Sequence, residues 1–145
     1  MIALLQRVSH ANVVVSGEQI AKIDAGLLVL LGVEKADDKA KAEKLVNKIL
    51  SYRVFEDNAG KMNLSLKDIM GELLIVPQFT LAANTNSGMR PSFSSAAAPV
   101  EGEKWFNYVV EESEKRQGRV QKGRFGADMK VSLLNDGPVT FWLQV

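Results

Sequence analysis

The sequence contains no cysteine and only one histidine among its 145 residues. Without cysteine there are no disulfides, no thiolate nucleophile and no cysteine-ligated metal site. A zinc site needs several His, Cys or carboxylate ligands, so we expect none; a magnesium site built from carboxylates stays open, but no acidic pair falls in a catalytic-looking loop and we assign no metal ligand. The one histidine, His10, has no evident nucleophile beside it, which argues against a Ser-His-Asp triad. We interpret His10 as a surface residue near the end of a strand.

Long apolar runs and nucleotide-binding glycine motifs are also lacking. The longest apolar run, Leu27–Leu31, is far shorter than the roughly 20 residues that cross a bilayer, so we expect no membrane association. The N-terminus has no basic n-region and no small-residue cleavage site, so no signal peptide is predicted, and the absence of cysteine fits a reducing cytoplasm. Neither GxGxxG nor a Walker loop occurs, so no cofactor is indicated. A net charge of +1 means that any contact with nucleic acid requires a local basic patch.

The remaining pattern predicts one domain over residues 1–145 with an α/β or α+β fold and a mostly antiparallel sheet. The first helix opens at Asp37 or Asp38, either of which can cap it, and the second runs from Pro99 to Gln117. A loop rich in small polar residues covers Asn84–Ala98. Strands are expected at Met1–Val8, Asn12–Ser16, Gln19–Ile23, Leu27–Val33, Val54–Glu56, Glu72–Leu81, Asp128–Leu134 and Val139–Val145.

The segment Pro77–Leu81 stands out because a proline breaks an apolar strand. If the ladder opens there, the N–H groups of Phe79 or Thr80 face a pocket and form an oxyanion hole. The alternative, which the pattern alone favours, is an ordinary strand with Phe79 in the core and Gln78 and Thr80 outside.

The segment Asn135–Thr140 also allows two interpretations. Asn, Asp, Gly and Pro are turn residues, so the pattern favours a plain turn between two strands. The functional alternative is a cis peptide at Gly137–Pro138, although only about 5–6% of X–Pro bonds are cis.

A third feature is the basic segment Lys115–Lys130, which holds six lysines and arginines and one aspartate. This local charge fits a phosphate-contacting patch. A solvated helix end is the competing interpretation, because cations also suit the C-terminus of a helix.

Along nearly its whole length the sequence resembles the D-aminoacyl-tRNA deacylase family. The resemblance rests on short motifs in the family's order: Met1–Val8, Gly26–Glu34, Gly60–Leu64, Gln78–Ala82, Gly88–Phe93, Gly123–Met129 and Asn135–Val145. It implies a barrel-like sheet with two main helices packed outside, and a homodimer that hydrolyses D-aminoacyl-tRNA and glycine mischarged on tRNA.

The resemblance also implies roles for individual residues. Gly137 and Pro138 form a cis peptide that reaches into the partner's pocket and excludes L substrates, and Gln78, Phe79 and Thr80 form the catalytic segment. Phe125 and Met129 are expected to line the pocket, with core packing as an equal alternative for both, and Arg7 to hold the Gly-Pro carbonyls.

One position departs from the family, because Pro77 replaces a serine, so no hydroxyl acts there. Two mechanisms stay open: attack by Thr80, or backbone N–H groups assisted by the 2′-hydroxyl of the tRNA. We prefer the second, since no base is visible beside Thr80. The alternative functions are a non-catalytic nucleic-acid-binding module and, more weakly, a general esterase for D-amino-acid esters.

Overall fold

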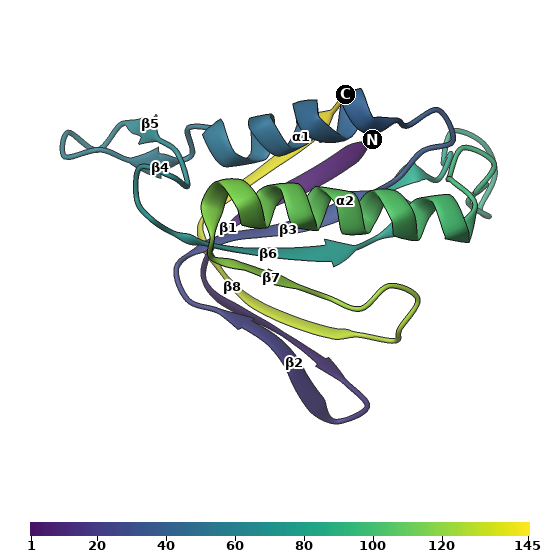
Figure 1. Cartoon of the computed structure of the whole chain (residues 1–145), viewed down its shortest axis with the longest axis horizontal. Helices are drawn as coiled ribbons and strands as arrows, with labels where there is room; N and C mark the ends of the chain where they lie inside the picture. The colour runs from purple at the N-terminus through teal and green to yellow at the C-terminus, as the bar shows by residue number, and fades with distance from the viewer.

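In the computed structural model, which describes residues 1–145, a strongly bent, barrel-like sheet carries two helices on its outer face (Figure 1). The helices are α1 (Lys39–Ser51) and α2 (Pro99–Gln117), and a short 3-10 helix, η1, covers Phe79–Ala82. The predicted α/β fold with two outer helices is confirmed. The strands are β1 (Ile2–Val15), β2 (Glu18–Ile23), β3 (Gly26–Gly32), β4 (Phe55–Glu56), β5 (Met62–Leu64), β6 (Glu72–Pro77), β7 (Val120–Lys122) and β8 (Lys130–Gln144).

The strand β1 organises the sheet because three other strands pair with it. β8 lies antiparallel to β1 over nearly its whole length. β3 and β2 share the other edge of β1, at β1 residues 2–8 and 11–15, and both are antiparallel to it. β6 pairs parallel with β3, and β7 pairs parallel with β6. β8 has no second neighbour, so it is a long edge strand.

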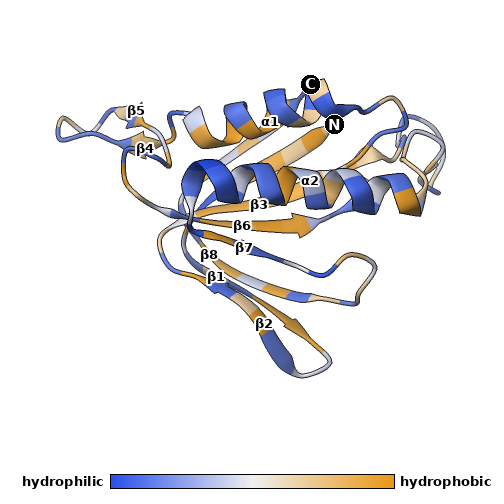
Figure 2. Cartoon of the chain, in the orientation of Figure 1, coloured by the Kyte–Doolittle hydropathy of each residue, from blue (hydrophilic) through white to orange (hydrophobic).

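The strand β3 is buried on both faces, as its continuous apolar sequence predicts (Figure 2). Leu27, Val29 and Leu31 pack in a cluster with α1 and α2, whereas Leu28 packs on the opposite face with Val76 of β6. The sheet therefore separates two apolar clusters, one under the helices and one inside the barrel.

Both helices begin where the sequence predicts. Asp38 caps α1, because its Oδ1 accepts the Lys41 N–H at 2.9 Å. Asp37 instead accepts a hydrogen bond from the amino group of Met1 at 2.7 Å. Pro99 lies in the first turn of α2. Neither helix is long and apolar enough to span a membrane.

The predicted turn at Asn135–Pro138 is wrong, because the two strands expected around it are one strand, β8. β1 runs alongside and pairs with β8 up to Asn135 and again from Thr140, so residues 136–139 lie opposite the single residue Arg7. The register between the two strands shifts on both sides of Val8, so the turn-forming residues make an irregularity in the ladder instead of reversing the chain.

The strand predicted over Glu72–Leu81 is also shorter than expected. β6 ends at Pro77, which has no N–H to continue a ladder, and the chain then enters η1. Two strands, β5 and β7, go unpredicted from the sequence because three residues are too few to show an alternating pattern.

Candidate active site

The chain changes direction directly after β6. The N–H of Gln78 still donates to the carbonyl oxygen of Leu31 at 2.8 Å, and η1 begins at the next residue. Gly32 of β3 makes room for this turn, since a Cβ there would lie 2.9 Å from the Cβ of Leu81. The glycine thus allows η1 to pack directly onto the sheet.

η1 begins with two backbone N–H groups that have no acceptor. The first donors of any helix lack partners within the helix. Those of Phe79 and Thr80 make no hydrogen bond in the chain, and the Gln78 side chain does not cap them. Phe79 is 57% exposed, so the alternative that buries it in the core of a regular strand is wrong.

The side chains of this segment provide no activated nucleophile. The Nε2 amide of Gln78 donates to the hydroxyl oxygen of Thr80, which engages a lone pair that a nucleophile would use. No histidine or carboxylate contacts this hydroxyl, and His10 is exposed on β1, as predicted. Nothing in the chain therefore acts as a base for Thr80.

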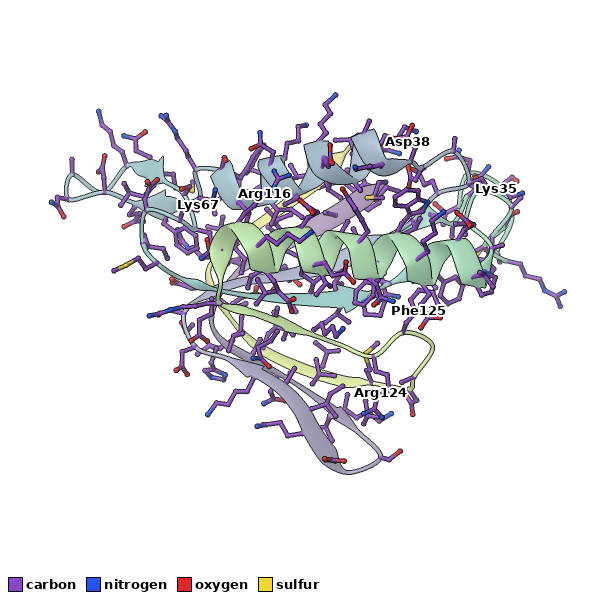
Figure 3. The ribbon with its side chains drawn as sticks, in the orientation of Figure 1. Lys35, Asp38, Lys67, Arg116, Arg124 and Phe125 are labelled. Carbon is purple, nitrogen blue, oxygen red and sulfur yellow. The ribbon has the colours of Figure 1, made fainter.

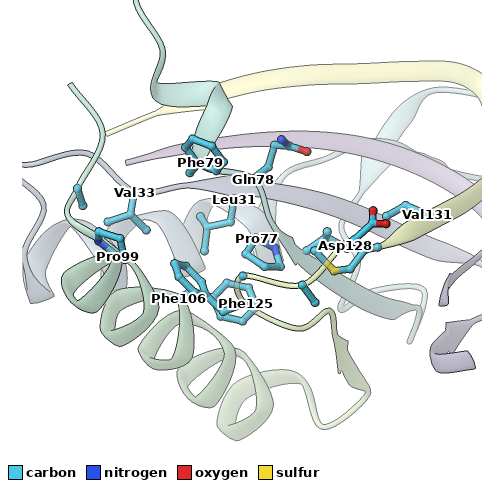
Figure 4. A pocket seen from close by; sticks show the side chains of 16 residues that line it. Leu31, Val33, Pro77, Gln78, Phe79, Pro99, Phe106, Phe125, Asp128 and Val131 are labelled. Carbon is cyan, nitrogen blue, oxygen red and sulfur yellow. The ribbon is translucent and has the colours of Figure 1, made fainter. Parts of the chain in front are cut away.

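A cavity of about 490 Å³ lies between η1, α2 and the segment before β8 (Figure 4). Its size and apolar walls are typical of a small-molecule site. Gln78 and Asp128 supply its only polar side chains, and the chain has no cluster of three or more metal-ligating residues. The lining residues are Leu31, Val33, Val76, Pro77, Gln78, Phe79, Ala97, Pro99, Gly102, Phe106, Phe125, Gly126, Ala127, Asp128, Met129 and Val131.

Two glycines allow close packing in the cavity wall. A Cβ at Gly123 would lie 2.8 Å from the sulfur of Met129 and 3.2 Å from Cδ of Pro77. A Cβ at Gly102 of α2 would lie 3.2 Å from the ring of Phe125. The positions of Phe125 and Met129 therefore depend on the absence of side chains at these two residues.

The Gly137–Pro138 peptide bond is cis and lies in β8, outside this cavity. Both residues are exposed in the single chain. Gly137 has φ +129°, a conformation that L side chains rarely adopt. The buried Arg7 donates from Nε to the carbonyl oxygen of Asp136 at 2.9 Å and from Nη1 to that of Val54 at 2.7 Å.

The structure therefore divides the predicted site residues into two groups. Gln78, Phe79, Phe125 and Met129 meet at the cavity, whereas Thr80, Arg7, Gly137 and Pro138 do not line it within one chain. Arg7 does not line the cavity within one chain; its guanidinium is bound to the carbonyl oxygens of Asp136, directly before Gly137, and of Val54, in the segment between α1 and β4.

Two aromatic residues of the site are not singled out by sequence reasoning. Phe106 lines the cavity, but its helical spacing indicates only a buried face of α2. Phe93 lies beside Phe79, with ring centroids 5.1 Å apart, and both rings are largely exposed. Phe93 does fall within a segment of the family resemblance, Gly88–Phe93, which is the one signal for it.

Comparisons with known proteins give one consistent family. The family model described as D-Tyr-tRNA(Tyr) deacylase matches residues 4–144. A protein of Janthinobacterium sp. (strain Marseille), named D-aminoacyl-tRNA deacylase, is 61% identical over 145 residues, which is all of this chain and 97% of the relative.

Solved structures share the whole fold. The one named c-Myc DNA Unwinding Element Binding Protein is 42% identical, with a TM-score of 0.95 over 100% of this chain and 99% of the other. A probable eukaryotic D-amino acid tRNA deacylase has a TM-score of 0.87 at 17% identity, over 99% and 98% of the two chains, and supports the fold alone.

Proposed function

This chain belongs to the D-aminoacyl-tRNA deacylase family and is a hydrolase acting on aminoacyl-tRNA, and we propose that its substrates are D-aminoacyl-tRNA and glycine mischarged on tRNA. The products are free tRNA and the amino acid. We place the reaction in the cytoplasm, where tRNA is charged and used. The observation that carries the proposal is the pair of backbone N–H groups at Phe79 and Thr80 that have no acceptor in the chain, in the turn that borders an apolar cavity whose one carboxylate, Asp128, is paired with Lys130.

The proposed mechanism stabilises the ester's developing oxyanion through the main chain. The N–H groups of Phe79 and Thr80 bind the carbonyl oxygen as negative charge grows on it. The 2′-hydroxyl of the terminal ribose helps to activate the attacking water, and Gln78 hydrogen-bonds the substrate or supports the neighbouring segment. Pro77 is compatible with this mechanism, because no step uses a hydroxyl at position 77.

The alternative mechanism gives Thr80 the role of a covalent nucleophile. A threonine hydroxyl needs a neighbouring base for that task. The Thr80 oxygen accepts a hydrogen bond from Gln78, and no base contacts the hydroxyl, so these contacts support the mechanism without a covalent intermediate.

We propose that Gly137 and Pro138 exclude L substrates from the cavity of a partner subunit in a homodimer. Their exposure in the single chain, and their position outside its own cavity, support a role across an interface. The unpaired edge of β8 also supports a dimer, since exposed edge strands are usually covered. Leu134 and Trp142 of β8 are each 52% exposed, which a partner would bury.

The selectivity follows from the geometry of a chiral centre. Main-chain oxygens of Gly137 and Pro138 occupy the side toward which an L side chain would project, so an L ester meets a clash and an unpaired polar contact. A D side chain points away, along the wall that contains Phe125 and Met129. Glycine has no side chain to collide and is therefore admitted.

The proposed function is tested by incubating the protein with D-Tyr-tRNA, Gly-tRNA and L-Tyr-tRNA. We expect catalytic hydrolysis of the first two and sparing of the third. If D-Tyr-tRNA stays intact at enzyme concentrations well above catalytic levels, the proposal fails. Equal rates with D-tyrosyl esters that lack the tRNA would favour a general esterase instead.

A second candidate is a nucleic-acid-binding protein without catalysis. The likeness to a structure named c-Myc DNA Unwinding Element Binding Protein favours it, together with the basic segment Lys115–Lys130. In that case affinity follows phosphate charge and salt concentration, with or without an amino acid on the 3′ end. Equal binding of charged and uncharged tRNA, without hydrolysis, would support this candidate.

A further inference from the structure

Several cations of the basic segment Lys115–Lys130 form ion pairs within the chain, so only a few of them are free to bind another molecule. Lys115 and Arg116 both pair with Glu112 of the same helix, at 2.8 Å and 3.2 Å. The carboxylate of Glu112 therefore offsets one of these two positive charges and engages both side chains within α2.

The remaining cations differ from one another. Lys130 pairs with Asp128 at 3.2 Å, and Arg119 donates to a backbone carbonyl at 3.4 Å. The side chains of Lys122 and Arg124 form neither an ion pair nor a hydrogen bond in the chain, and both residues are exposed. These two, separated by Gly123, are the free cations of the segment.

Lys122 and Arg124 lie at a second cavity, of about 330 Å³, between α2 and the segment after β7. Phe106 and Phe125 line both this cavity and the candidate active site, so the two cavities are neighbours across the same rings. Figure 3 shows Arg124 and Phe125 in adjoining parts of the loop below α2.

We propose that Lys122 and Arg124 bind phosphate oxygens of the 3′-terminal nucleotides of the tRNA while the aminoacyl group occupies the first cavity. This inference rests on the proposed function. The ester joins the amino acid to the terminal ribose, so the nearest phosphodiester groups must lie close to the catalytic cavity. Unpaired cations are the side chains that hold such phosphates in register.

Two polar residues of α2 complete the second cavity and fit the sugar of the same nucleotides. Glu103 and Asn107 lie opposite the cations. The carboxylate of Glu103 would repel a second anion, but it can accept a hydrogen bond from a ribose hydroxyl. The amide oxygen of Asn107 can also accept such a hydrogen bond. The cavity thus combines two phosphate-binding groups with acceptors for hydroxyl groups, which suits a ribose-phosphate better than a free dianion.

The test compares K122Q/R124Q with the control K115Q/R116Q, which removes the same charge from two residues that already form ion pairs with Glu112. kcat/KM for D-Tyr-tRNA is measured over a range of salt concentrations. Each contact to a single-stranded phosphate contributes about 0.7 to the slope of log affinity against log salt. We expect K122Q/R124Q to lower kcat/KM roughly 10- to 20-fold at about 0.15 M salt, mainly through KM, and to reduce the slope by about 1.4.

A substrate without phosphate separates this role from effects on the fold. D-tyrosyl adenosine, an ester without the phosphodiester chain, should be hydrolysed equally by the wild type, K122Q/R124Q and the control. An unchanged salt slope in K122Q/R124Q, or an equal loss with the adenosine ester, overturns the inference. A wild type that leaves D-Tyr-tRNA intact refutes the proposed function itself, so the two failures are distinct.

Discussion

Arg7 donates a hydrogen bond from Nε to the carbonyl oxygen of Asp136 at 2.9 Å, directly before Gly137–Pro138. The same guanidinium reaches the carbonyl oxygen of Val54 at 2.7 Å, and only 8% of the residue is exposed. The segment that we propose to exclude L substrates is thus tied to the core by the buried guanidinium of Arg7, which also lies 3.5 Å from the carboxylate of Asp136.

Replacing Arg7 by lysine should loosen this segment while keeping the charge. A lysine ammonium cannot donate to both carbonyl groups with the geometry of the planar fork. We expect R7K to lower the free energy of unfolding by about 2 kcal/mol, since a hydrogen bond from a charged group contributes roughly 1.5–3 kcal/mol. Denaturant titration measures this, and deacylation rates should show a lower preference for D-Tyr-tRNA over L-Tyr-tRNA. Unchanged discrimination would contradict the positioning role.

Replacing Phe79 by proline tests the oxyanion role of the main chain. Proline removes the N–H at the first residue of η1, where its fixed φ is tolerated. The loss of one oxyanion donor should lower kcat roughly 100- to 1,000-fold. The control F79A keeps the N–H and removes the ring, so its effect on kcat should be much smaller. Equal losses in F79P and F79A, measured by single-turnover hydrolysis of D-Tyr-tRNA, would argue against the donor.

Replacing Thr80 by alanine distinguishes the two mechanisms. The proposed mechanism uses the N–H of residue 80, which alanine retains, so T80A should keep kcat within roughly tenfold of the wild type, a change of about 1.4 kcal/mol in the barrier. A loss of several orders of magnitude, with tRNA binding unchanged, would establish the hydroxyl as the nucleophile. Kinetics and a binding titration on the same preparation decide the question.

Replacing Gly123 by alanine should narrow the cavity from one side. The added Cβ would lie 2.8 Å from the sulfur of Met129, so this side chain, which lines the cavity, must shift. One methyl group in an apolar pocket changes discrimination by roughly 10- to 200-fold. We therefore expect G123A to lower kcat/KM for D-Tyr-tRNA more than for Gly-tRNA. The double variant G123A/M129A removes the Met129 side chain that the new Cβ would contact, so it should recover activity toward D-Tyr-tRNA. If activity is not recovered, contact with Met129 does not cause the loss in G123A.

Much of the fold is predictable from the sequence because it depends on local periodicity. β3 reads as a strand buried on both faces, and α2 begins and ends at the predicted residues, Pro99 and Gln117. Asp38 caps α1 as the helix-start pattern predicts. In each case the signal lies within the segment itself.

The wrong predictions arise where a distant segment decides the structure. Asn135–Pro138 reads as a turn, but the residues on both sides of it pair with β1, so the chain continues in one direction and residues 136–139 form an irregularity within β8. The candidate site is also hard to predict from the sequence, because distant segments form it. Phe106 reads only as helix core, yet it separates two cavities whose other walls come from β2, β6, β7 and η1.

The central claim is that two parts of one active site come from different subunits. One part is the pair of ester-binding donors, the N–H groups of Phe79 and Thr80, and the other is the chiral filter, Gly137–Pro138, which excludes L substrates. It can be tested in a mixed dimer, purified through two tags, of F79P and G137A/P138A subunits. The G137A/P138A substitution should open the filter, since an L side chain is strained at φ +129° and a Cβ there would lie 3.0 Å from Nη2 of Arg7. The homodimer of this variant should therefore cleave L-Tyr-tRNA, and the F79P homodimer should cleave D-Tyr-tRNA roughly 100- to 1,000-fold more slowly than the wild type and spare L-Tyr-tRNA.

In the mixed dimer the active cavity belongs to the G137A/P138A subunit, and its filter comes from the intact Gly137–Pro138 of the F79P subunit. The decisive measurement is the ratio of D-Tyr-tRNA to L-Tyr-tRNA hydrolysis by this species. We predict a ratio like that of the wild type, with L-Tyr-tRNA spared. A mixed dimer that cleaves L-Tyr-tRNA as readily as the G137A/P138A homodimer would place the filter and the donors in the same subunit and contradict the account.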